Sequence, residues 1–300
     1  MSEHLSENLS ETPRSQRWRR LGVVTVVAAS TVASVGVTAA SGAVPAASSS
    51  ASPASRPAPA KPTIVFVHGA FADSSGFDSE IRTLRRLGYP VLAAPDPLRT
   101  VSGDADSVRA LLATVAGPVV LVGHSYGGAV ITNAAVGAPN VKALVYLGAF
   151  IPDAGQSIND IQVATPGSLL GPATTRIVPF ADPSMPGGQN ADIYVQADQY
   201  RAVIAADVDA RTAADMAVTQ RPLALSAQLG PSGPPAWKTV PSWDLITLDD
   251  RAIPAAAQRA MAARAGAHVE TVHSSHAVMV SHPKAVVDII LDAAKAAAGH

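Results

Sequence analysis

The chain has 300 residues, a formal net charge of −1 and no cysteine. A nearly neutral chain without a basic patch in its main body argues against nucleic acid as a partner. The lack of cysteine excludes disulfides, a thiol nucleophile and a cysteine-ligated metal site.

Residues 1–43 have the layout of a secretory signal peptide. The segment begins with an arginine cluster made up of Arg14, Arg17, Arg19 and Arg20. The apolar run Leu21–Ala40 follows, and after it come small residues suited to cleavage. The Arg19-Arg20 pair suggests twin-arginine export, but the next residues fit that signal poorly, so general secretion is the alternative. We therefore expect a secreted, extracellular protein without stable membrane association after cleavage. An uncleaved membrane anchor is the competing interpretation, because about twenty apolar residues can span a bilayer.

Residues 44–61 are rich in Ala, Ser and Pro and predict an extended linker. The remaining segment, 62–300, is long enough for one well-buried domain with an insertion. Its short apolar runs predict strands at Thr63–Val67, Tyr89–Ala93, Val119–Val122, Val141–Leu147, Trp243–Leu248 and His268–Val272. Apolar residues at helical spacing predict helices at Phe77–Leu87, Asp104–Ala116, Gly128–Val136, Pro254–Ala265 and Pro283–Ala298. Alternation of apolar strands with helices predicts an α/β fold, with a mostly parallel sheet covered by helices on both faces.

The alternation breaks between residues 151 and 236, which contain many Pro, Gly and Asp and no obvious strand. Within this segment, Ile193, Gln196, Tyr200 and Val203 are spaced like one face of a helix over Ala191–Ala217. We therefore predict a mostly helical insertion here.

Gly123-His124-Ser125-Tyr126-Gly127 is a G-x-S-x-G motif between a predicted strand and a predicted helix. This is the context of a nucleophile elbow, a sharp turn that exposes a serine hydroxyl. The pentapeptide alone is weak evidence, because chance supplies it in about one chain in ten of this length. A glycine-rich turn without catalytic function is the simpler interpretation, so partner residues are needed.

A serine needs a base within hydrogen-bond reach and an acid that orients the base. His276 follows the last predicted strand by four residues and is our candidate base, with His273 as its rival. We expect His68 and His124, which lie inside other motifs, to make structural hydrogen bonds.

The candidate acid is Asp250, which follows the strand before; Asp249 is second and Asp153 third. Asp249 and Asp250 could instead cap the helix that begins near Pro254. The order Ser, Asp, His is the one found in α/β-hydrolases. For the oxyanion that develops on the substrate, we expect donors at the backbone N–H groups of Tyr126 and Ala70.

Four segments together resemble the α/β-hydrolase superfamily, namely Val65–Phe71, Gly123–Gly128, Asp250–Pro254 and Ser275-His276. The chain is most similar to the branch of esterases, hydroxynitrile lyases and plant methyl-ester hydrolases, whose first strand-turn also contains His-Gly-Ala. The resemblance covers about 62–298, implies no cofactor and no metal, and places 151–236 where that family has its lid. The sheet is expected to be smaller than the family's eight strands, because no strand pair is evident before Thr63.

Our leading hypothesis is an exported serine hydrolase that cleaves a small-molecule carboxylic ester through an acyl-enzyme. Expected substrate contacts are Phe71, Phe150, Ile151, Phe180 and Tyr200. Lyase or cofactor-free peroxidase chemistry with the same three residues is an alternative, and Lys238 is the one lysine placed to serve a lyase. A non-catalytic ligand-binding protein with this fold is the third hypothesis.

Overall fold

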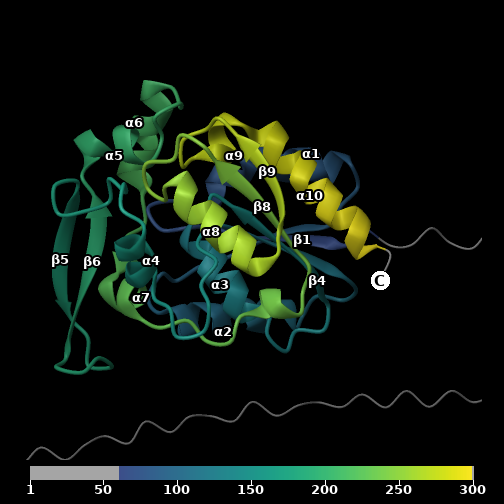
Figure 1. The fold of residues 1–300 in the computed structure, drawn as a ribbon, viewed down its shortest axis with the longest axis horizontal. Coiled ribbons are helices and arrows are strands. Elements are labelled where there is room, and N and C mark those ends of the chain that lie inside the picture. Colours follow the sequence, from purple (N-terminus) through teal and green to yellow (C-terminus); the bar gives the residue numbers. More distant parts are fainter. Residues whose placement is uncertain (1–60, 299–300) are drawn as a thin grey trace, which may run out of the picture. The chain divides into compact units, whose positions relative to one another are not determined.

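The computed structural model describes residues 61–298, which contain a six-stranded, fully parallel sheet in the order β2-β1-β3-β4-β8-β9. Figure 1 labels four of these strands, β1, β4, β8 and β9. The strands are β1 (Thr63–Val67), β2 (Val91–Ala94), β3 (Val119–His124), β4 (Val141–Leu147), β8 (Ser242–Thr247) and β9 (His268–Val272). The predicted signal peptide, 1–43, lies outside the described residues, as does the predicted linker apart from Lys61.

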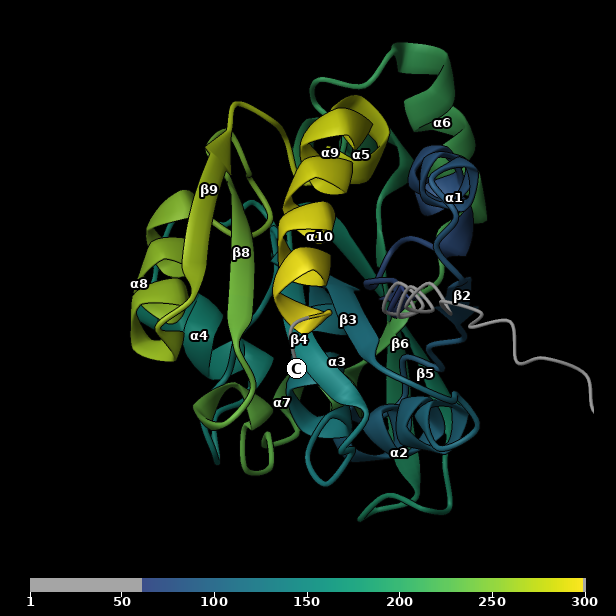
Figure 2. The same ribbon diagram turned by 90° about the vertical axis from the view of Figure 1, so that its right-hand side faces the viewer.

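Both faces of the sheet are covered by helices. Side chains alternate between the two faces along each strand, and the strands carry apolar side chains on both, so each face needs a layer that buries it. In β1, Val65 and Val67 belong to the core on one face, whereas Ile64 and Phe66 belong to the core on the other. The first face packs against α2 (Val101–Leu112), α3 (Tyr126–Ala134) and α8 (Ala255–Ala265). The opposite face packs against η1 (Ser74–Phe77), α1 (Asp78–Arg86), α9 (Val278–Ser281) and α10 (Pro283–Ala297), and Figure 2 shows α10 lying along the strands.

The predicted α/β class and parallel sheet are confirmed, and most predicted strands agree with the structure to within two residues. Within residues 61–298 this sheet has six strands, fewer than the eight-stranded standard, as expected. The boundaries of α2 differ most: the helix ends at Leu112 rather than Ala116, and it begins at Val101 rather than Asp104. The hydroxyl of Thr100 accepts a hydrogen bond from the backbone N–H of Gly103 and caps the helix there.

The insertion between β4 and β8 contains several helices, as predicted, but the expectation that it holds no strand is wrong. It contains a three-stranded antiparallel sheet, β5-β6-β7, beside short helices (Figure 1). Its elements are α4 (Ile158–Ala164), β5 (Thr175–Ala181), β6 (Gln189–Val195), α5 (Ala197–Val203), α6 (Ala210–Thr219), β7 (Leu223–Ala224), α7 (Leu225–Leu229) and η2 (Ala236–Lys238). The first residues of the helix predicted over Ala191–Ala217 therefore belong to a strand. We call residues 151–236 the lid segment below.

Within residues 61–298, no helix combines the length and the apolar character that a bilayer crossing requires.

Candidate active site

Ser125 occupies the turn between β3 and α3 and has a backbone conformation that side chains rarely adopt, with φ 54° and ψ −123°. The turn is closed by glycines on either side. A Cβ on Gly123 would lie 2.6 Å from the carbonyl oxygen of Gly127, and a Cβ on Gly127 would lie 2.5 Å from that of Val67. Only glycine fits at both positions without moving backbone, so the motif allows β1, β3 and α3 to approach closely and presents the Ser125 hydroxyl at the strand end.

Ser125, His276 and Asp250 form a continuous hydrogen-bonded chain. His276 Nε2 lies 2.8 Å from Ser125 Oγ, and His276 Nδ1 lies 2.8 Å from Asp250 Oδ2. The side chains of His276 and Asp250 are buried. Because the carboxylate accepts a hydrogen bond from Nδ1–H, the proton of the neutral ring is held on Nδ1 and the Nε2 atom is left free to accept the serine proton. The geometry is that of a nucleophile with its base and an orienting acid.

The carboxylate of Asp250 is fixed by four further donors. Its Oδ1 accepts the backbone N–H groups of Ala252 and Ile253, both at 2.8 Å. Its Oδ2 accepts the hydroxyl of Thr247 at 2.7 Å and the amide of Gln258 at 3.1 Å. Asp250 therefore orders the loop before α8 and orients the histidine at once, whereas α8 itself begins after Pro254 without a side-chain cap.

The rival residues lie elsewhere. Asp249 and His273 pair with each other at 3.3 Å, with side chains 61% and 81% exposed. Asp153 pairs with Lys238 at 2.9 Å, also at the surface. Neither pair contacts Ser125 through a hydrogen bond, so the geometry favours Asp250 and His276 over these alternatives.

The two expected oxyanion donors both lie beside Ser125. Ala70 and Tyr126 line the same cavity as the serine, and neither backbone N–H donates a hydrogen bond within residues 61–298. The turn that contains Ala70 is held from the lid segment. Phe71 N–H donates to the carbonyl of Arg221 at 2.8 Å, and the Tyr200 hydroxyl donates to the carbonyl of Phe71 at 2.6 Å.

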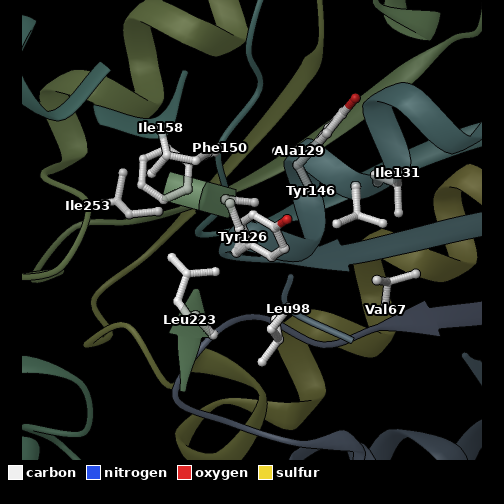
Figure 3. Packing of buried hydrophobic residues seen from close by; sticks show 14 of the residues in the cluster. Val67, Leu98, Tyr126, Ala129, Ile131, Tyr146, Phe150, Ile158, Leu223 and Ile253 are labelled. Atoms are coloured by element: carbon white, nitrogen blue, oxygen red, sulfur yellow. The ribbon is translucent and has the colours of Figure 1, made fainter. Parts of the chain in front are cut away.

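The cavity at Ser125 measures about 210 Å³ and is mostly apolar. Five of its sixteen lining residues lie outside the lid segment, namely Ala70, Phe71, Ser125, Tyr126 and Phe150. The lid segment contributes the other eleven: Ile158, Gln162, Leu170, Gly171, Pro172, Thr175, Ile177, Ile193, Leu223, Leu225 and Gln228. Figure 3 shows Tyr126, Phe150, Ile158 and Leu223 grouped where core and lid segment meet.

Two of the expected substrate contacts, Phe71 and Phe150, line this cavity, and three do not. Ile151 is fully buried, and its N–H contacts the sulfur of Met261. Tyr200 lines a separate cavity of about 250 Å³ and holds the Phe71 turn. Phe180 lies on β5 under the guanidinium of Arg99. None of these three side chains lines the Ser125 cavity; each packs against or holds other parts of the protein. The lid residues that do line the cavity had no sequence signal beyond scattered apolar character.

His68 and His124 make structural hydrogen bonds, as expected. His68 Nδ1 donates to the carbonyl of Gly69 at 2.9 Å, and Arg221 donates to its Nε2 at 3.1 Å. His124 Nε2 donates to the carbonyl of His276 at 2.9 Å. Burial lowers the pKa of both rings, that of His124 to about 3, so both imidazoles are neutral near pH 7.

In the described part of the chain, no group of three or more acidic or histidine side chains is arranged to hold a metal ion.

Comparison with known proteins identifies the family. A sequence profile of the Alpha/beta hydrolase family matches residues 64–289. The chain belongs to the α/β-hydrolase family. The match runs from β1 into α10 and includes the elbow, the acid loop and the histidine loop.

Two curated relatives of this α/β-hydrolase cover part of its sequence. A probable hydrolase from Phoma sp. is 41% identical over 125 residues, which are 36% of this chain and 51% of that protein. A carbendazim hydrolyzing esterase from Nocardioides sp. is 36% identical over 110 residues, 31% of this chain and 44% of that protein. The chain thus spans about half the length of these two relatives.

The crystal structure of polyneuridine aldehyde esterase has the same fold, with a TM-score of 0.68 at 18% sequence identity. The superposition covers 77% of this chain and 98% of that chain.

Proposed function

We propose that this α/β-hydrolase is a serine hydrolase that cleaves a carboxylic ester through an acyl-enzyme. The observation that supports it most is the chain of 2.8 Å contacts from Ser125 through His276 to Asp250, beside two backbone N–H groups that donate no hydrogen bond to any of residues 61–298. The esterase names of the Nocardioides relative and of the similar solved structure support the same reaction class.

In the proposed reaction, Ser125 Oγ attacks the ester carbonyl carbon while its proton passes to His276 Nε2. The carbonyl oxygen becomes negative and accepts hydrogen bonds from the backbone N–H groups of Ala70 and Tyr126. Collapse of this intermediate breaks the bond to the alcohol, which leaves with the proton from His276. Water then gives one proton to His276 while its oxygen attacks the acyl carbon. The bond between the acyl carbon and Ser125 Oγ breaks, His276 returns the proton to Ser125 Oγ, and the carboxylic acid leaves. Asp250 stabilises the imidazolium at each stage without taking its proton.

The test is turnover of a chromogenic short-chain ester by the purified full chain and by Ser125→Ala. The proposal expects the substitution to reduce turnover by at least about 10³-fold while the circular dichroism spectrum is unchanged. Turnover that survives the substitution would contradict the mechanism.

The competing activities have less support. Lys238, the lysine considered for lyase chemistry, is paired with Asp153 and is not among the residues that line the Ser125 cavity. Release of cyanide or aldehyde from cyanohydrins would favour the lyase, and halide oxidation by peroxide would favour the peroxidase. A chain that binds ligands but resists a fluorophosphonate at Ser125 would be the non-catalytic protein.

The localisation proposal depends on the sequence of residues 1–43 alone. We propose that the chain is exported and cleaved near residue 43. Mass spectrometry of the protein in the culture medium and in the membrane fraction tests it. A processed chain in the medium supports export, whereas the full-length chain in membranes supports the anchor.

A further inference from the structure

Two glutamine side chains lie in the mostly apolar lid wall of the Ser125 cavity. Gln162 belongs to α4 and Gln228 to α7, and both are half-buried. Gln228 Nε2 donates to Gln162 Oε1 at 3.2 Å, so the two amides lie against each other. They also line an adjoining surface depression that Ser125 does not reach, which places them where the cavity meets the outside of the lid segment.

The amide pair keeps hydrogen-bonding capacity that other polar groups in the cavity wall have committed. The Tyr126 hydroxyl donates to Asp104 at 2.7 Å, and the Thr175 hydroxyl donates to the carbonyl of Gly171 at 2.9 Å. Within the described residues, by contrast, the Gln162 NH₂ group and the Gln228 carbonyl oxygen make no hydrogen bond. An unused donor thus lies next to an unused acceptor. This arrangement complements a group that both accepts and donates, such as a hydroxyl or a carboxamide.

The charge of the cavity narrows the class of ligand further. None of the sixteen lining residues carries a charged side chain. A carboxylate or an ammonium group would therefore lose hydration without gaining an ionic partner, which is costly in an apolar pocket. We therefore expect the part of the ester that occupies the cavity to be uncharged.

We propose that the substrate is a neutral ester whose apolar body ends in a hydroxyl or carboxamide group, and that Gln162 and Gln228 bind this group. The inference rests on the proposed ester hydrolysis. It makes the two glutamines specificity-determining residues, while the chemistry stays with Ser125, His276 and Asp250.

A bracing role for the pair leads to a different expectation. A brace between α4 and α7 would position the whole lid wall, so its loss would lower turnover of all esters alike and lower the melting temperature. A recognition role changes the ratio between esters that differ only in their terminal group, because only one of them makes the hydrogen bond.

The experiment measures kcat/KM of the full chain for pairs of esters of equal length, one ending in a hydroxyl and one in a methyl group. The terminal group is placed on the acyl part in one series and on the alcohol part in another. Gln162→Met and Gln228→Met keep side-chain volume while removing the amide, and Gln199→Met is the control on a lid helix outside the cavity. The expected result, in one series, is a three- to tenfold fall in the hydroxyl-to-methyl ratio, about the strength of one hydrogen bond. The fall should occur in both cavity variants and not in the control.

An unchanged ratio in both cavity variants, or an equal loss for every ester, would overturn the inference while leaving ester hydrolysis intact. Absence of turnover for every ester in the unmodified chain, with no fluorophosphonate adduct on Ser125, would overturn the proposed function and this inference together.

Discussion

The imidazole of His124 donates a hydrogen bond to the backbone carbonyl of His276, at 2.9 Å. The residue before the proposed nucleophile thus holds the loop of the proposed base, although 151 residues separate His276 from Ser125. The other ring nitrogen of His124 is buried and has no partner within residues 61–298. Burial keeps the ring neutral, so its single ring proton lies on Nε2, the nitrogen that donates to the carbonyl.

His124→Phe should keep the ring volume and remove this hydrogen bond. We expect kcat for a chromogenic ester to fall about tenfold with KM little changed, because the His276 loop loses one neutral hydrogen bond. The rate of fluorophosphonate labelling should fall in parallel. His273→Phe is the matched control, since His273 is exposed. Equal kinetics for the two variants would show that the contact does not position the base.

Asp250→Asn and Asp249→Asn separate the two adjacent carboxylates. The first substitution should lower kcat about 10³- to 10⁴-fold, because an amide opposite Nδ1 favours the wrong imidazole tautomer. The second should change kcat less than about twofold, because Asp249 is exposed and pairs only with His273 among the described side chains. The reverse order of effects would assign the orienting role to Asp249.

Gly127→Ala tests the close packing of the elbow. The added Cβ would lie 2.5 Å from the carbonyl oxygen of Val67, so β1 or α3 must move. We expect a loss of at least about 2 kcal/mol in the free energy of unfolding, measured by urea denaturation. Gly171→Ala is the control for stability, because a Cβ there meets no atom within 4 Å. Similar losses in the two variants would show that the elbow is not tightly packed.

Glu80 should make the fold less stable as the pH rises. Its carboxylate oxygens are buried without a hydrogen-bond partner in the described part of the chain, and burial raises its pKa to about 8. Between the ordinary pKa of 4.5 and about 8, the unfolded chain has lost this proton and the folded chain retains it. Stability contributed by the group is therefore complete below pH 4.5 and declines up to about pH 8.

Glu80→Gln removes this titration. Relative to the unmodified chain, the variant should gain stability between pH 5 and pH 8, on the order of a few kcal/mol, because one pKa unit corresponds to about 1.4 kcal/mol. Urea denaturation at both pH values measures the difference. A difference between the two proteins that does not vary with pH would show that Glu80 is solvated or paired.

The sequence allowed the strand-end residues to be placed together, because each follows a recognisable strand: Ser125 and Asp250 follow the buried strands β3 and β8, and His276 follows the exposed edge strand β9. Val119–His124 and His268–Val272 both end at the carboxyl edge of a parallel sheet, where the loop after the second strand can reach across β8 and β4 to bring His276 to Ser125. Asp249 and Asp250 could not be separated from sequence alone. The choice depends on which way a short loop turns, and here the Ala252 and Ile253 N–H groups turn Asp250 inward.

The lid segment escaped sequence reasoning for two physical reasons. First, Ile193, Gln196, Tyr200 and Val203 are spaced like one face of a single helix. In the structure, Ile193 lies in β6, which ends at Val195, and only Tyr200 and Val203 lie in α5. Second, in β5, Pro179 argues against a central strand, and β5 is in fact an edge strand of β5-β6-β7. Because the lid segment supplies most of the cavity wall, the substrate contacts were the least predictable part of the site.

Reaction of the full chain with a fluorophosphonate, followed by intact-mass analysis and peptide mapping, tests the central claim most directly. The account predicts one adduct per chain, located on Ser125, with loss of ester turnover in proportion to labelling. A folded chain without an adduct on Ser125, or with full ester turnover after complete labelling, would contradict it.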